Sequence, residues 1–226
     1  MKLTFGELVW QLEKLYGVPT RTKRDAEGAV HFQSDLLDEL IGTILSQNTT
    51  DKNSSRAFAS LKASFPTWER VLSAPTRKLA DAIKIGGLAN IKAKRIKTIL
   101  AELHKKNGRL SLAHLHEMNT NAAMAYLQEF NGVGFKTAAC VLMFGLHRDL
   151  CPVDTHIHRI LNRLGLLSTK HADETFLQLQ SLIPKGKSYS LHINLIRHGK
   201  QVCKAQTPNC VQCLLAESCA FARQND

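Results

Sequence analysis

The sequence predicts an all-α protein, and three observations support that prediction. Apolar residues recur at intervals of three and four, the period of an amphipathic helix, whereas the alternation typical of strands is almost absent. Residues that favour helix caps precede the periodic segments, and glycines follow several of them. Apolar residues make up 44% of the 226 residues, which is enough to form a substantial core.

The first predicted helices are set by periodicity and by their caps. Residues 5–16 form an amphipathic helix whose apolar residues share one side. A second helix covers residues 36–45, with Ser34 as its predicted cap. A third runs from Thr76, also a predicted cap, to Ile83, and the glycines that follow end it.

A basic helix follows, and its charged side has two interpretations. Asn90 begins the helix and Gly108 ends it. The residues predicted to lie on its outer side are Lys92, Lys94, Arg95 and Lys97. Such a row is either an ordinary solvated face or a surface that faces phosphate groups, and the sequence favours neither.

The stretch "NGVGFK" separates two further helices. The first begins at Asn119 or Asn121 and reaches Phe130, and the second begins after Gly134. Gly132 is predicted to take a left-handed φ and to cap the first helix, whereas Gly134 allows a tight turn and a close approach by a partner. The free N–H groups of the second helix then suit a phosphate group. The pattern indicates a helix–hairpin–helix contact with DNA, or an ordinary turn between two helices.

Lys136 and Asp154 are the candidate catalytic residues. Lys136 lies in the first turn of its helix, where the helix dipole disfavours the ammonium form, so we expect a nucleophilic amine there. Asp154 or Thr155 begins a helix that runs through Leu164, and Asp154 lies where its N-cap would be. It is either a simple cap or a carboxylate that faces the lysine and stabilises a cationic sugar. For Lys136, the alternative is a solvated surface lysine.

The six cysteines are unevenly placed. Cys140 and Cys151 lie mid-chain, whereas the other four are close together near the end: Cys203, Cys210, Cys213 and Cys219. Disulfide frameworks belong to oxidising compartments, so such clustering in an intracellular chain indicates ligands of a metal ion or cluster.

Charge and hydropathy restrict the partners. The net charge of +11 and the pI of about 9.5 favour an acidic polymer, although a basic balance also occurs in proteins that are merely soluble. No segment approaches the roughly 18 apolar residues of a membrane span, and the N-terminus does not resemble a signal peptide. We therefore expect a soluble, intracellular protein with no membrane partner. Our further predictions are that it is cytoplasmic, nucleoid-associated and monomeric.

These motifs together resemble those of the endonuclease III family of DNA glycosylases and abasic-site lyases, within the helix–hairpin–helix superfamily. The resemblance covers about residues 36–219 and rests on "GVGFKTA" (132–138), "VDTHIHRILNRLG" (153–165) and the Cys-x6-Cys-x2-Cys-x5-Cys spacing. That spacing matches the family's 4Fe–4S cluster. Zinc also fits four cysteines and is the alternative.

The resemblance implies a two-lobed fold and a specific chemistry. A six-helix barrel domain would span 29–148, and an iron–sulfur cluster domain would combine 1–28 with 149–226. The family excises oxidised pyrimidines from double-stranded DNA and nicks abasic sites by β-elimination. The lysine nucleophile of the family matches Lys136, its charge-stabilising carboxylate matches Asp154, and its cluster ligands match the four clustered cysteines.

The resemblance also implies DNA contacts. "ILSQNTTD" (44–51) resembles the loop that fills the gap left by a flipped base, with Asn48 at the filling position. "GLANIKA" (87–93) resembles the loop that wedges the opposite strand, with Leu88 as the wedge or else a buried loop residue. Gly132, Gly134 and Lys204 complete the expected DNA-binding residues.

The sequence departs from the family pattern at Asn48, Ala89, Asn131 and Phe135, which are positions involved in gap filling, strand wedging and phosphate contact. Two other functions remain open. A non-catalytic DNA-binding module would keep the scaffold, but the presence of both Lys136 and Asp154 argues against it. A related adenine glycosylase needs a glutamate where this chain has Thr43.

Overall fold

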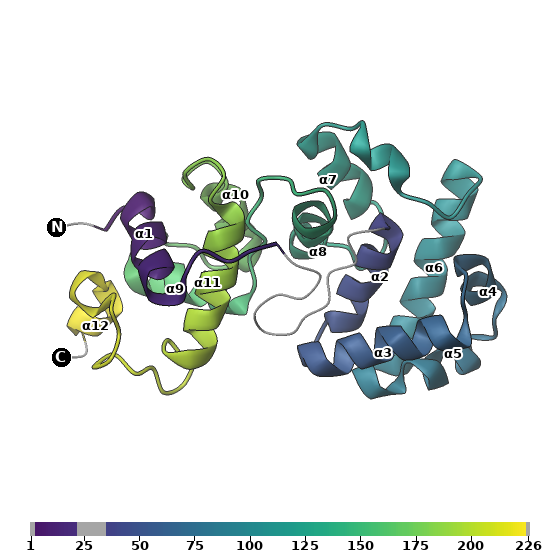
Figure 1. The fold of residues 1–226 in the computed structure, drawn as a ribbon, viewed down its shortest axis with the longest axis horizontal. Coiled ribbons are helices and arrows are strands. Elements are labelled where there is room, and N and C mark those ends of the chain that lie inside the picture. The colour runs from purple at the N-terminus through teal and green to yellow at the C-terminus, as the bar shows by residue number, and fades with distance from the viewer. Residues whose placement is uncertain (1–2, 22–34, 225–226) are drawn as a thin grey trace. The chain divides into compact units, whose positions relative to one another are not determined.

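The computed structural model describes residues 3–21 and 35–224. These residues form α-helices joined by 3-10 and π-helical turns, with no strand among them, which confirms the predicted all-α class (Figure 1). No helix in these two ranges is long and apolar enough to cross a membrane. The chain divides into two compact units, residues 21–148 and residues 1–20 with 149–226. The expected boundary between 28 and 29 lies outside the described residues.

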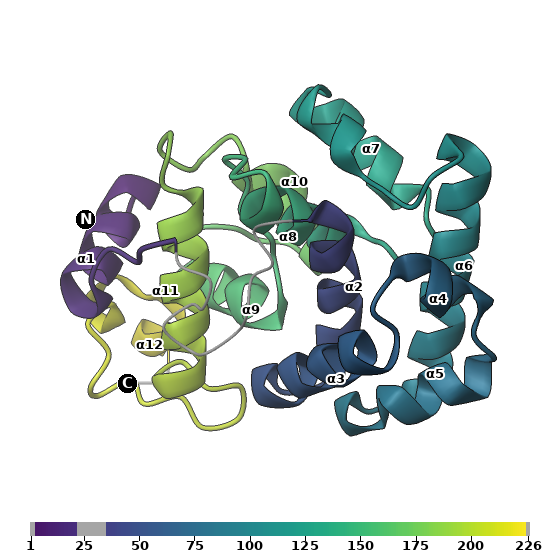
Figure 2. The same ribbon diagram turned by 45° about the vertical axis from the view of Figure 1, so that its right-hand side comes forward.

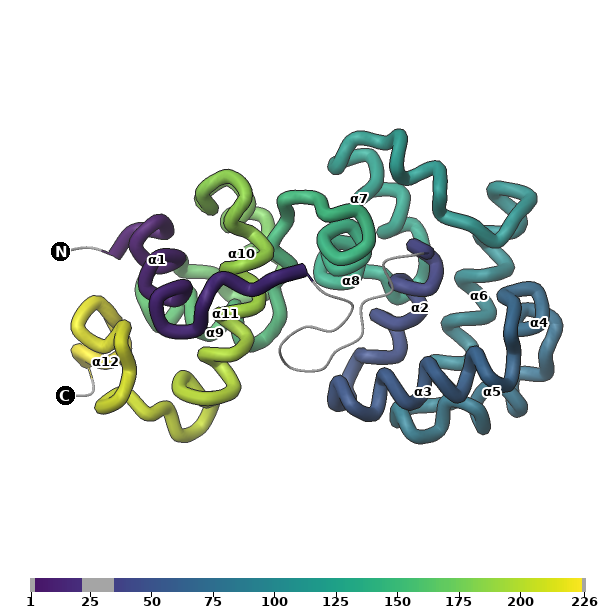
Figure 3. Tube along the Cα trace, viewed as in Figure 1, coloured from purple at the N-terminus to yellow at the C-terminus, as the bar shows by residue number. Residues whose placement is uncertain are grey.

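One unit combines the first helix with the C-terminal part of the chain. Its helices are α1 (Phe5–Tyr16), α9 (Thr155–Leu164), α10 (Ala172–Leu179), α11 (Ser188–Gln201) and α12 (Ala220–Gln224). α11 packs against both α1 and α9 (Figures 1 and 3). Side chains of α11 also bind the end of α1, because Arg197 donates to the Tyr16 carbonyl (2.9 Å) and Asn194 donates to that of Gly17 (3.0 Å). The N-terminal helix is thereby fixed to the C-terminal segment.

The other unit is built around a buried helix. Its elements are α2 (Leu36–Ser46), α3 (Asp51–Ser64), α4 (Trp68–Ser73), α5 (Thr76–Ala82), the 3-10 turn η1 (Lys84–Gly86), α6 (Ala89–Asn107), the 3-10 turn η2 (Ala113–His116), α7 (Thr120–Gln128), α8 (Phe135–Cys140) and the π-helical turn η3 (Val141–Gly145). α2 packs against α3, α6, α8 and η3 (Figure 2). Most of its residues are buried, so it forms the centre of this unit's core.

Several predicted caps differ from the structure. The cap of α2 is Asp35, whose side chain accepts from Leu37 N, and the predicted cap Ser34 lies outside the described residues. Thr76 is the first residue of α5, not its cap, because Pro75 occupies the cap position without a side-chain hydrogen bond. The backbone of Pro75 (φ −58°, ψ 135°) is non-helical, as is usual for an N-cap, and agrees with the fixed φ of proline.

The basic helix contains the largest error of the sequence prediction. α6 begins at Ala89, one residue before Asn90. Lys92, predicted to lie on its outer side, is 1% exposed. Only Lys94 of the predicted row is fully exposed, because Arg95 and Lys97 donate hydrogen bonds to other parts of the unit. Helical periodicity explains the error, since Lys92 shares a face with the buried residues Ile96 and Ile99.

Candidate active site and cysteine pocket

The turn between α7 and α8 contains the two glycines of the GVG motif. Gly132 has a φ of 81°, as predicted, but it does not cap α7. That helix ends at Gln128 rather than Phe130, because its last turn tightens into three-residue hydrogen bonds such as Phe130 N to Leu127 O (3.3 Å). Gly134 is the N-cap of α8, and a Cβ added there would meet no heavy atom within 4 Å. The packing of the protein therefore leaves open space beside Gly134.

Lys136 is the second residue of α8 and is half-buried. Within residues 35–148, its amine has no hydrogen-bond or ion-pair partner. By contrast, Lys62 pairs with Asp38 (3.2 Å) in the same unit. The amine of Lys136 is therefore not occupied by a structural ion pair, as a nucleophile requires.

Asp154 is the N-cap of α9, which confirms its predicted place at the start of that helix. One carboxylate oxygen, Oδ1, accepts from Ile157 N over 2.9 Å. The side chain is half-buried, and in residues 149–224 no partner of Oδ2 is found. The cap therefore orients the carboxylate and leaves its second oxygen available for another contact.

The loop after α2 contains a hydrogen-bonded glutamine that the sequence analysis missed. Gln47 Oε1 accepts from Arg95 Nη1 (2.6 Å), and its Nε2 donates to Thr137 Oγ1 (3.2 Å). This amide links the loop to α6 and to the residue that follows Lys136. The next residue, Asn48, is exposed and has a φ of 52°. Asn48, the expected gap-filling residue, therefore follows directly after a side chain that is fixed by hydrogen bonds.

Leu88 lies at the N-cap of α6 with a φ of 49° and is 50% exposed, so it is not the buried loop residue of the alternative interpretation. Two further apolar side chains on the same stretch, Ile85 and Ile91, are 37% and 57% exposed. Neither was predicted from the sequence, although both lie three residues from Leu88, one on each side. An exposed apolar group of this kind is typical of a contact site.

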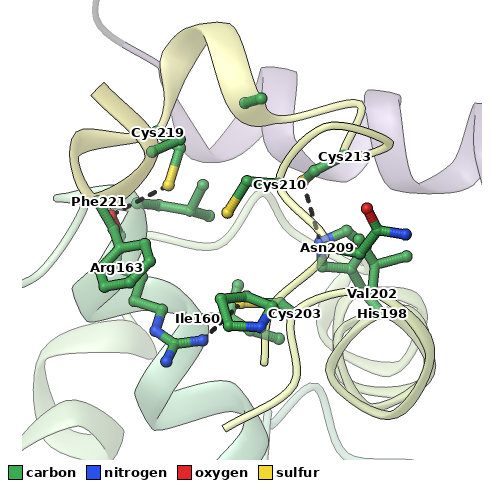
Figure 4. A pocket seen from close by; sticks show the side chains of 14 residues that line it. Ile160, Arg163, His198, Val202, Cys203, Asn209, Cys210, Cys213, Cys219 and Phe221 are labelled. Atoms are coloured by element: carbon green, nitrogen blue, oxygen red, sulfur yellow. Dashed lines mark hydrogen bonds between the residues drawn. The ribbon is translucent and has the colours of Figure 1, made fainter. Parts of the chain in front are cut away.

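The four clustered cysteines surround one pocket in the other unit (Figure 4). Cys203, Cys210 and Cys213 are half-buried, and Cys219 is buried. Arg163, which the sequence analysis did not assign, donates to Cys203 Sγ (3.4 Å) and to the carbonyl of Lys204 (2.7 Å). Lys204 itself is exposed. The arginine therefore fixes the loop from which the first cysteine and the expected DNA-contacting lysine project.

The pocket has the electrostatics of a cation site. The pKa of the Cys213 thiol is raised, first because burial removes a thiolate from water and also because Cys203, Cys219 and Cys210 would repel its charge. A bound cation relieves both penalties. His198 borders the same pocket, with Nε2 3.6 Å from Cys213 Sγ and Nδ1 hydrogen-bonded to the Tyr16 hydroxyl (3.0 Å).

The cysteine side chains do not form a ready single-ion site. In the described part of the chain, no three His, Cys, Asp or Glu side chains converge closely enough to hold one metal ion. A tetrahedral zinc ion with Zn–S bonds of about 2.3 Å needs such convergence. The four thiols thus line one pocket but do not converge on a single point.

The fold and these sites define a helical protein with a hairpin turn, a four-cysteine pocket and, beside the turn, a lysine whose amine has no partner among the described residues. Comparison with known proteins identifies the family. Residues 41–185 match the HhH-GPD superfamily of base excision DNA repair proteins. An endonuclease III of Thermotoga maritima is 35% identical over 194 residues, which are 86% of this chain and 87% of that protein. The chain therefore belongs to the endonuclease III family of the HhH-GPD superfamily and is a DNA glycosylase of base excision repair.

Two further comparisons agree with that assignment. A protein of Arabidopsis thaliana that is named as a DNA glycosylase is 41% identical over 169 residues. These residues are 74% of this chain and 58% of the plant protein. Among solved structures, an endonuclease III in a non-covalent complex with DNA superimposes with a TM-score of 0.81 and 25% identity, covering 99% of this chain and 98% of that one. The predicted helix–hairpin–helix glycosylase fold is confirmed.

Proposed function

We propose that the protein excises oxidised pyrimidines from double-stranded DNA and cleaves the strand at the abasic site. Family membership supports the glycosylase step, and the endonuclease III relative of similar extent supports the lyase step. The observation that bears most directly on this chain is the half-buried amine of Lys136, which has no partner within residues 35–148 and follows the hairpin turn by two residues.

The proposed chemistry uses that amine as a nucleophile. Lys136 Nζ attacks C1′ of the damaged nucleotide, the N-glycosidic bond breaks, and the base leaves with its bonding electron pair and takes up a proton. The Asp154 carboxylate accepts a proton from the amine and stabilises the positive charge that develops on the sugar. Opening of the sugar ring gives an imine between Lys136 and C1′. Loss of a proton from C2′ then breaks the C3′–O bond and nicks the strand 3′ to the lesion.

DNA binding in this proposal combines charge with side chains that enter the duplex. The net charge of +11 favours phosphate contacts, and the similar endonuclease III structure is a complex with DNA. The open space beside Gly134 suits a close phosphate approach, with Lys204 as a second contact. The exposed side chains of Asn48 and Leu88 would occupy the space left by a flipped nucleotide.

Substrate choice and the role of Asp154 are tested together. Duplexes that contain an oxidised pyrimidine, an oxidised purine, or adenine opposite oxidised guanine are incubated with excess protein, and base release is measured separately from strand cleavage. We expect release of the oxidised pyrimidine alone. Asp154→Asn keeps a side-chain oxygen for the cap but loses the carboxylate, so base release should fall by about two to three orders of magnitude. Cleavage of a ready-made abasic site should fall less, because the aldehyde is already electrophilic. Preferred release of adenine would contradict the proposal.

We propose further that Cys203, Cys210, Cys213 and Cys219 hold a 4Fe–4S cluster. The shared pocket supports a bound metal group, and the Cys-x6-Cys-x2-Cys-x5-Cys spacing, which resembles that of the family's cluster, favours a 4Fe–4S cluster over zinc. Such a cluster would form four covalent Fe–S bonds to the protein, and its iron ions can change oxidation state. Here the ligands would tie the segment after α11 to the start of α12.

Elemental analysis tests the cluster. Protein purified without oxygen should contain about four irons and four sulfides per chain and should absorb broadly near 400 nm, as thiolate-held clusters do. One zinc per chain and no iron would overturn the assignment. The proposed lysine chemistry would not be affected by that result, because no step uses the cluster.

A further inference from the structure

Lys92 is a buried charged side chain that takes no part in the chemistry proposed above. It lies on the first turn of α6 and is 1% exposed. Its ammonium group donates to the carbonyl oxygens of Leu45 (2.7 Å) and Gly86 (2.8 Å). An ammonium ion is seldom taken out of water unless its hydrogen bonds are replaced, so these two contacts fix the positions of three segments at once.

The first acceptor belongs to the last turn of α2. Its carbonyl is among the final four of the helix, which have no partner within the helix itself. α2 has no basic residue in its own last turn, so Lys92 supplies the cation that the negative end of the helix dipole favours. Three residues after Leu45 comes Asn48, with its positive φ of 52°.

The second acceptor belongs to the turn η1, directly before α6. A Cβ added to Gly86 would lie 3.0 Å from the Cβ of Ala57 on α3 and 3.9 Å from the Leu45 carbonyl oxygen, so this turn packs tightly against α3 and lies beside the end of α2. Two residues later, Leu88 has a φ of 49° and exposes half of its surface. A leucine rarely adopts a positive φ, and such a conformation persists only where its surroundings fix it.

The two loops are thus alike in one respect. In residues 3–21 and 35–224, the non-glycine residues with positive φ are Asn48, Leu88 and His147. Two of these three follow a carbonyl group that Lys92 binds, within two or three residues. The same ammonium group therefore holds the starting points of both unusual loop conformations.

We propose that Lys92 is a positioning residue that holds Asn48 and Leu88 at a fixed spacing, so that both side chains enter the duplex together when a nucleotide leaves the stack. The proposal rests on the proposed function, because that function assigns both side chains to DNA. Preorganisation of this kind lowers the entropy cost of inserting two loops. Lys92 touches neither the substrate nor the reacting atoms and acts only through the two loops.

Two variants remove the bridge in different ways. Lys92→Met keeps an unbranched chain of similar length but leaves both carbonyl groups without their donor. Gly86→Ala keeps the ammonium group but displaces η1 from α3, because the new Cβ would meet the Cβ of Ala57 at 3.0 Å, and it thereby shifts the Gly86 carbonyl that Lys92 binds. Leu103→Ala is the control for lost stability, because it makes a cavity in the same helix about 16 Å from Lys92. The three variants and the parent are compared at temperatures at which each has the same folded fraction.

Base unstacking is measured without chemistry, in the Lys136→Gln background. A 2-aminopurine placed beside the damaged nucleotide in a duplex brightens when the stack opens. We expect Lys92→Met and Gly86→Ala to reduce this signal at saturating protein, and Leu103→Ala to leave it unchanged. With Lys136 present, single-turnover excision from a duplex should fall about 10- to 100-fold, as misplaced groups typically cause. Cleavage of an abasic site in single-stranded DNA, which has no stack to open, should change little.

A double-mutant cycle identifies the route of the effect. If Lys92 acts through the loops, Lys92→Met should have a much smaller effect on duplex excision once Asn48 and Leu88 are both alanine. An undiminished effect in that background, equal losses on duplex and single-stranded DNA, or an unstacking signal equal to that of the parent would overturn the proposal. Failure of the parent protein to cleave abasic DNA would instead contradict the proposed function, because the unstacking measurement needs no lysine chemistry.

Discussion

Arg95 donates a hydrogen bond of 2.6 Å to the side-chain oxygen of Gln47, and the amide nitrogen of the same glutamine donates to Thr137. The loop after α2 is thereby bonded to α6 and to the residue next to Lys136. The loop that contains Asn48 is therefore hydrogen-bonded to Thr137, the residue next to the candidate nucleophile, within one unit.

Replacement of Gln47 by alanine should separate the two parts of this network. The Thr137 hydroxyl is buried and would lose its partner, so the free energy of unfolding should fall by about 1 kcal/mol. Excision from duplex DNA should fall by more than this loss of stability explains, because the loop that contains Asn48 is no longer bonded to Thr137, the residue next to Lys136. Urea denaturation and single-turnover kinetics measure the two effects. Gln178→Ala, an exposed glutamine of the other unit, is the control, and an excision rate equal to that of this control would exclude the network from function.

Gly134→Ala should weaken DNA binding without affecting the fold. Its backbone conformation (φ −91°, ψ −175°) suits any residue, and its added Cβ meets nothing within 4 Å in the protein. A loss of affinity would therefore report an external group, and a phosphate contact predicts equal losses for all sequences. Binding to damaged and undamaged duplexes is compared by fluorescence anisotropy. Gly6→Ala on α1 is the matched control, and equal affinities for both variants would show that nothing approaches Gly134 closely.

Cys213→Ser should remove the cluster, whereas Cys140→Ser should retain it. Cys213 lines the four-cysteine pocket, but Cys140 is buried on α8 in the other unit. Iron content and the absorbance near 400 nm should therefore be lost only in the first variant. Retention of a full complement of iron by Cys213→Ser would show that the pocket is not the cluster site.

The buried Lys92 predicts a pH dependence of stability. Burial lowers its pKa from 10.5, because the ammonium form loses its hydration. Between the lowered pKa and 10.5 the unfolded chain therefore binds the proton more often than the folded chain, and stability rises with pH in that window. The unfolding free energy of the parent minus that of Lys92→Met should therefore increase as the pH approaches 10.5. Urea denaturation at several alkaline pH values measures this difference. A decrease as the pH rises would contradict the lowered pKa of Lys92.

Local sequence signals predicted those elements whose ends depend on adjacent residues. α1 has the predicted bounds because Thr4 and Glu7 form a capping box, and α9 begins after Asp154 because the aspartate caps it. The burial of Lys92 was also visible, since it falls on the apolar face of its helix, but its charge outweighed periodicity in the interpretation. The role of Gln47 could not be predicted, because its partners lie 48 and 90 residues away in the sequence. The four-cysteine pocket was predicted because its spacing is local, whereas the contribution of Arg163 depends on tertiary packing.

The central claim is that the Lys136 amine forms a covalent bond with the sugar, and borohydride trapping tests it most directly. The parent protein, Lys136→Gln and the control Lys105→Gln, an exposed lysine on α6, are each mixed with abasic duplex DNA and borohydride. The parent and Lys105→Gln should form a stable protein–DNA adduct, because the reductant converts the imine to an amine. Lys136→Gln should form none while it still binds DNA, with at most about one unit less in the slope of log affinity against log salt. Adduct formation by Lys136→Gln at the parent's rate would show that another amine is the nucleophile and would contradict the account.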